Sequence, residues 1–317
     1  MVSLRFLNNN LQRLGLFNLS KENKVDPKRR TSHNIFVVLQ YTIVCINLSA
    51  YLYSTMTRSV RHSAEFTKGV CELCVASMGL YLTNYLRVNQ DQLMSLITFM
   101  ENSFSKSNTK IIAKYDRKCK LVFITVFAVI TCTFFEAFLE SFLPLSAKEL
   151  EIRRLVYRTQ DPERRHPYNV RYPCIDESES WAFEIVLVHQ TYVIVVQVCF
   201  LSLLLSIPPF IMLNVQAQYK ILAKYIGKIG DKHRDSFENE IFYTNIETNE
   251  VHILTTSDKA RRIYLDKNTR IRIYQEYEQN YLKQIVQFHQ KLLIFHDKVC
   301  CVPSLEIIRV SNLNHNQ

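Results

Sequence analysis

The stretch from Ile185 to Tyr219, IVLVHQTYVIVVQVCFLSLLLSIPPFIMLNVQAQY, decides the fold class, because it contains 35 consecutive residues without Lys, Arg, Asp or Glu. A helix needs about 20 predominantly apolar residues to cross the hydrocarbon core of a bilayer. The stretch therefore predicts a membrane span at about residues 185–212, followed by a helical extension. Because a proline removes a backbone donor and clashes with the preceding turn, we expect Pro208 and Pro209 to kink this helix.

Three earlier blocks have the same character. Residues 34–57 carry no charge over 24 residues, residues 69–86 carry only Glu72, and the block at 121–143 begins with 15 uncharged residues. Each block alone could be a buried helix of a soluble core, but four in one chain favour a membrane protein. Only 5 Gly and 8 Pro occur among 317 residues, so we predict an all-α, polytopic helical membrane protein with four spans.

The distribution of basic residues predicts the orientation of these spans. Residues 1–33, 87–120 and 220–317 carry 7, 7 and 15 Lys and Arg, whereas residues 58–68 and 146–184 carry 3 and 7. Cytoplasmic loops are enriched in basic residues, so we expect a cytoplasmic N-terminus. The net charge of +10 then reflects the basic residues that orient the spans. These residues are spread over several loops, which argues against a nucleic-acid partner.

This topology divides the chain into four parts. We expect a cytoplasmic N-terminal segment at 1–33, a membrane domain at 34–219, a cytoplasmic segment at 220–299 and a divergent tail at 300–317. Residues 228–280 are polar without a strong pattern. Apolar residues return at helical spacing in 281–299, which predicts an amphipathic helix rather than a span.

Motifs for catalysis, nucleotide binding and metal binding are missing from the sequence. It contains no G-x-G-x-x-G, P-loop, H-E-x-x-H or G-x-S-x-G. Cys71 and Cys74 form a C-x-x-C, and His289 and His296 share a helical face, but no further ligands accompany either pair. We interpret both pairs as packing or surface residues and expect no enzyme activity, no cofactor and no metal.

Ionisable and polar side chains within the predicted spans are functional candidates. An ionisable residue in a bilayer faces a cavity or a partner by default, which applies to Glu72 and Glu136. Glu140 lies near the outer end of its span and could instead reach water. His189 and Tyr192, in the outer half of the fourth span, could line a pocket or pack between helices.

Several segments, taken in order, resemble the insect odorant receptors. The third predicted span ends in ESFLPL (140–145), and the outer loop leads into the fourth as RYPCIDESESWAFEIVLVHQTYVI (171–194). The fourth span continues past its prolines into LNVQAQYKIL (213–222). YLKQIVQFHQKLLIFHDKV (281–299) is similar to the approach to the fifth span in that family. The resemblance covers roughly residues 1–299.

The resemblance implies a seven-span subunit with its N-terminus inside, in the plasma membrane of olfactory sensory neurons. It also implies a hetero-tetrameric, odorant-gated cation channel formed with a co-receptor subunit among membrane lipids. A volatile small molecule would bind among the spans in the outer half of the membrane. Each candidate for that site could equally be a plain packing residue. The candidates at helical spacing on spans two, three and four are Cys74, Met78, Tyr81, Thr131, Phe134, Phe135, Phe138, His189, Tyr192, Val193 and Val196.

After Val299 the chain departs from the family pattern. The helix that leads to the fifth span is not followed by an apolar span, and spans six and seven have no counterpart, so four of an expected seven spans are present. We therefore expect a chain truncated before the fifth span, without the pore helix. The alternatives are a gustatory receptor-type chemoreceptor, a non-conducting vestigial subunit, or a small membrane transporter. A transporter would need intramembrane clusters of ionisable residues or inverted repeats, and the sequence displays neither.

Overall fold

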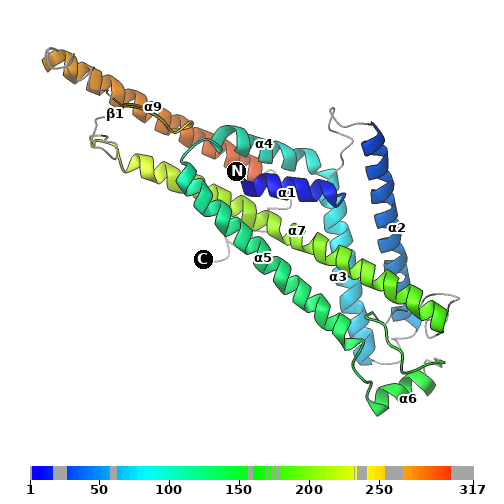
Figure 1. Cartoon of the computed structure of the whole chain (residues 1–317). Helices are drawn as coiled ribbons and strands as arrows, with labels where there is room; N and C mark the ends of the chain where they lie inside the picture. Colours follow the sequence, from blue (N-terminus) through cyan, green and yellow to red (C-terminus); the bar gives the residue numbers. More distant parts are fainter. Residues whose placement is uncertain are drawn as a thin grey trace. The chain divides into compact units, whose positions relative to one another are not determined.

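The computed structural model describes residues 2–16, 27–57, 63–155, 160–168, 170, 172, 175, 179–231, 233, 241–253 and 267–300. Figure 1 shows its elements in chain order. They are α1 (Val2–Arg13), α2 (Pro27–Thr57), α3 (Ser63–Val88), α4 (Gln90–Phe104), α5 (Thr109–Glu140), α6 (Ala147–Leu155), α7 (Ser180–Ile226), β1 (Ile241–Asn245), β2 (Glu250–Ile253) and α9 (Lys267–Cys300). The predicted all-α class is confirmed. The sheet found among the described residues is a single two-stranded hairpin.

Each predicted span falls on a long helix. By length and composition, α2, α5 and α7 are apolar enough to cross a membrane. The helix α3 has 26 residues but does not meet the same criterion, because Glu72 and Asn84 lower the apolar character of its central stretch. The count of four spans and the cytoplasmic N-terminus therefore stay predictions. The helix α7 continues through Pro208 and Pro209, so the two prolines do not end it.

Residues 228–280 contain more structure than their polar sequence indicates. The strands β1 and β2 pair as an antiparallel hairpin, with Asn245 opposite Glu250. The turn forms because the Asn245 side-chain oxygen accepts the backbone N–H groups of Glu247 and Thr248, at 3.0 and 3.2 Å. Asn249 takes a left-handed conformation with φ of 56°, which asparagine tolerates better than most residues.

The helix α9 begins well before the apolar pattern does. Its buried face continues toward the N-terminus through Tyr277 and Tyr281, ahead of Ile285 and Phe288. These tyrosines keep the spacing of three or four residues that defines one helical face. The polar residues between them concealed this continuity in the sequence.

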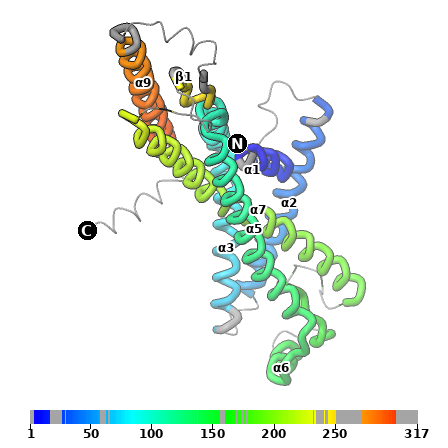
Figure 2. Tube along the Cα trace, turned by 60° about the vertical axis from the view of Figure 1, so that its left-hand side comes forward, coloured from blue at the N-terminus to red at the C-terminus, as the bar shows by residue number. Residues whose placement is uncertain are grey.

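The chain divides into two compact units. Unit 1 comprises the described residues of 1–6, 91–121 and 208–317, and unit 2 comprises those of 7–90 and 122–207. In unit 1, Phe104 of α4 contacts Phe288 of α9 edge to face, with ring centroids 5.3 Å apart. The Tyr281 hydroxyl donates to the backbone oxygen of Tyr225 at 2.9 Å. Accordingly, α9 and the end of α7 lie side by side in both views (Figure 1, Figure 2).

Candidate functional site

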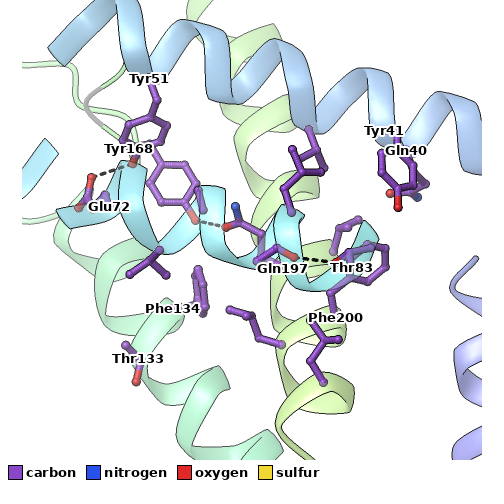
Figure 3. A pocket seen from close by; sticks show the side chains of 18 of the residues that line it. Gln40, Tyr41, Tyr51, Glu72, Thr83, Thr133, Phe134, Tyr168, Gln197 and Phe200 are labelled. Atoms are coloured by element: carbon purple, nitrogen blue, oxygen red, sulfur yellow. Dashed lines mark hydrogen bonds between the residues drawn. The ribbon is translucent and has the colours of Figure 1, made fainter. Parts of the chain in front are cut away.

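Unit 2 contains an apolar cavity of about 300 Å³. Its walls come from α2, α3, α5 and α7, together with Tyr168 from the segment between α6 and α7. Most of the wall is aliphatic or aromatic, as in small-molecule sites generally. The polar side chains on the wall are Gln40, Tyr41, Tyr51, Glu72, Thr83, Thr133, Tyr168 and Gln197. Figure 3 shows how they lie around the apolar space.

Two hydrogen-bonded pairs occupy one end of this cavity (Figure 3). The Tyr51 hydroxyl donates to the Glu72 carboxylate at 2.8 Å, and the Tyr168 hydroxyl donates to the Gln197 side-chain oxygen at 2.7 Å. The rings of Tyr51 and Tyr168 meet edge to face, with centroids 5.4 Å apart. Burial, reinforced by the nearby Glu72 charge, raises the pKa of Tyr168, so its hydroxyl stays a neutral donor.

Gln190 of α7 fixes Tyr168 in place. Its side-chain oxygen accepts the backbone N–H of Tyr168 at 2.9 Å, and its side-chain nitrogen donates to the backbone oxygen of Tyr168 at 3.2 Å. Gln190 is fully buried, so water does not compete for these bonds. A polar side chain within the apolar helix thus anchors the segment that closes one end of the cavity.

A cluster of ion pairs joins the end of α5 to the segment before Tyr168. Glu140 pairs with Lys68 at 3.3 Å and also with Arg165. Glu140 therefore belongs to this cluster and does not line the cavity. Its side chain is 42% exposed, which agrees with the expectation that it could reach water.

The other polar part of the wall lies on α2. The Gln40 side-chain nitrogen donates to the Tyr192 hydroxyl, which gives the polar tip of Tyr192 a helix-packing role. The Gln40 side-chain oxygen and the Tyr41 hydroxyl are buried without a hydrogen-bond partner among the described residues. Such groups are costly to bury, so this region suits a ligand with a donor for the Gln40 oxygen or a polar group for the Tyr41 hydroxyl.

Among the predicted ligand-binding residues, the structure brings Phe134 and Val196 to the cavity wall. The remaining nine lie elsewhere. Val193 is fully buried in the helix core, and Phe138 packs against that core. His189 contacts the Tyr172 ring edge to face, with centroids 6.0 Å apart. Thr131 buries its hydroxyl away from the cavity wall. Exposed side chains off the wall are those of Cys74, Met78, Tyr81, Phe135 and Tyr192.

On α3 the cavity face is not the one predicted. The α3 residues on the wall include Glu72, Val75 and Gly79, whereas the predicted Met78 and Tyr81 do not line it. Periodicity identifies which side chains share a face of a helix, but α3 is apolar on several faces, so it does not identify the inward one. The charge of Glu72 within an apolar block was the signal that did point to the cavity.

Sequence reasoning missed Tyr51, Tyr168 and Gln197. Gln197 could have been noticed as an amide within an apolar stretch, but Tyr168 carried no signal, because its position depends on Gln190. Glu136 is exposed and does not line the cavity. The described residues hold no group of three or more His, Cys, Asp and Glu that could bind a metal ion.

Comparisons with known proteins find a sequence family and two solved structures that are similar to this chain. Residues 64–302 match the sequence profile of a family described as "7tm Odorant receptor". The fold is similar to the insect olfactory receptor OR5 from Machilis hrabei in complex with eugenol. The TM-score is 0.54 and the identity 11%, over 94% of this chain and 69% of that one. A second structure of that receptor gives a TM-score of 0.45 and 13% identity, over 94% and 80% of the two chains. No curated protein sequence matches significantly.

Proposed function

Because the chain belongs to the 7tm odorant receptor family, we propose that it binds volatile small molecules in the cavity of unit 2. It acts as the ligand-binding part of an odorant-gated cation channel that is formed with a co-receptor subunit in the plasma membrane of olfactory sensory neurons. The family match favours this function over a gustatory receptor or a transporter, and it describes a receptor rather than an enzyme.

The cavity is the observation that supports the proposal most. At roughly 30 Å³ for each water-sized group, a volume of about 300 Å³ accommodates about ten such groups, which suits a volatile molecule. The apolar wall contributes affinity by burial, and the few polar groups orient the ligand. A ligand opens a channel only if it binds the open state more tightly than the closed one, so residues on the wall should also affect gating.

Two adjacent phenylalanines on α5 allow a matched test. Phe134 lines the cavity, whereas Phe135 is 55% exposed and does not. We expect Phe134→Ala to change the rank order of odorants in currents recorded from cells that express the chain with a co-receptor. Phe135→Ala should leave that order unchanged. Equal effects of the two substitutions, or no effect of Phe134→Ala, would refute the assignment of the ligand to this cavity.

A further inference from the structure

The cavity wall holds a carboxylate for which the described residues provide no cationic partner. Among the described residues on the wall, Glu72 alone carries a charge. Among the described residues, its hydrogen-bond partner is the Tyr51 hydroxyl, a neutral donor at 2.8 Å. An anion among apolar groups is poorly solvated unless a positive charge approaches it.

Two described basic side chains of unit 2, Lys68 and Arg165, are already engaged. Lys68 lies one helical turn before Glu72 on α3, but its ammonium pairs with Glu140 at 3.3 Å. Arg165 pairs with the same Glu140 carboxylate. Among the ion pairs formed by described residues, none includes Glu72.

The surroundings of Glu72 suit an ammonium group. The Tyr51 hydroxyl contacts the carboxylate, the Tyr51 and Tyr168 rings meet edge to face, and Phe134 lies on the same wall, so aromatic rings form part of the cavity that holds Glu72. Aromatic faces attract cations, more strongly where water is excluded. The rest of the wall is aliphatic and would enclose a hydrocarbon body.

We propose that this cavity selects volatile amines, with the ligand ammonium paired to Glu72 and its apolar body among α3, α5 and α7. This inference rests on the proposed function and specifies the substrate class of the same site. A primary alkylamine, like the lysine side chain, is protonated at neutral pH and would bring a positive charge to Glu72.

Three probes of equal size separate charge from shape. Phenethylamine, 2-phenylethanol and propylbenzene would each be titrated into the full chain in lipid nanodiscs at pH 7, with affinity measured by calorimetry. We expect the amine to bind at least tenfold more tightly than the alcohol. Glu72→Gln should abolish that preference and leave propylbenzene binding within threefold of wild type. Glu136→Gln, on the exposed side of α5, is the matched control and should retain the preference.

The outcomes distinguish the two proposals. Alcohol and amine binding with equal affinity, both reduced by Phe134→Ala, would overturn the amine assignment and leave the cavity as the ligand site. Failure of all three probes to bind would overturn both. If Glu72→Gln did not fold, the comparison of the three probes on the wild-type chain would still decide the question, because it needs no substitution.

Discussion

Replacing Gln190 with leucine tests how the structure holds Tyr168 at the cavity. The substitution keeps the side-chain volume similar but removes both bonds to the Tyr168 backbone. The N–H of Tyr168 loses its side-chain partner while buried, which costs about 1–3 kcal/mol. The carbonyl oxygen still accepts the Val170 N–H at 2.8 Å, so its loss is smaller, about 0.5–1.5 kcal/mol. We therefore expect Gln190→Leu to lower the free energy of unfolding by about 1.5–4.5 kcal/mol.

The same helix provides the control. Gln218 is also fully buried, but its side-chain nitrogen and oxygen have no partner among the described residues. Gln218→Leu removes an uncompensated buried amide, so stability should stay unchanged or rise by about 1 kcal/mol. The two substitutions are chemically identical and occur on one helix, which cancels their effects on helix propensity and hydropathy.

The assay is equilibrium unfolding of the full chain in detergent micelles, followed by far-UV circular dichroism. The fluorescence of Trp181, the single tryptophan, reports on the start of α7. A loss below about 0.5 kcal/mol for Gln190→Leu would refute the hydrogen-bond argument. An equal loss for both variants would refute it too, because burial of leucine rather than the missing bonds would then explain the change.

Three further predictions concern the cavity, the hairpin and the alkaline limit of stability. Among the described residues, a Cβ added at Gly79 meets Leu201 alone, at 3.8 Å, so Gly79→Ala should bind ligand as wild type does. Gly79→Leu should instead fill the cavity and reduce affinity more than tenfold in the titration of the three probes. Asn249→Val should destabilise the hairpin by about 1 kcal/mol more than Asn249→Gly, because both variants lose the side-chain oxygen but only valine disfavours the positive φ. Amide hydrogen exchange of the hairpin would measure the difference. Equal exchange in the two variants would contradict the argument from backbone conformation. Burial raises the pKa of Tyr277 and Tyr281 above the ordinary value of 10.0, so their contribution to folding stability is fully present below that pH and is lost as the pH rises toward the folded pKa values. In thermal unfolding, the double variant Tyr277→Phe/Tyr281→Phe should therefore lose less stability at alkaline pH than the wild type. An unchanged alkaline loss would refute the contribution of these tyrosines.

The prediction of α9 illustrates where sequence patterns stop being informative. Apolar periodicity identified residues 281–299 correctly as helical, yet the helix starts at Lys267. The missing part depends on Tyr277, whose hydroxyl contacts His233 and lies 3.1 Å from the Thr244 hydroxyl. A pattern that counts tyrosine as polar cannot include it, because its burial requires partners from distant segments.

The sequence by itself determined the four long apolar helices α2, α3, α5 and α7, because length, uncharged runs and rarity of Gly and Pro are local properties that act within one segment. It also pointed to Glu72, since a charge inside an apolar block is visible without any neighbour. Only the tertiary structure decided which face of α3 borders the cavity and which tyrosines meet the carboxylate. The physical reason is that lipid and protein core are both apolar, so a membrane helix bears no amphipathic mark of its inward face. That face is set by contacts such as those of Gln190 with Tyr168, between residues 22 positions apart in the chain.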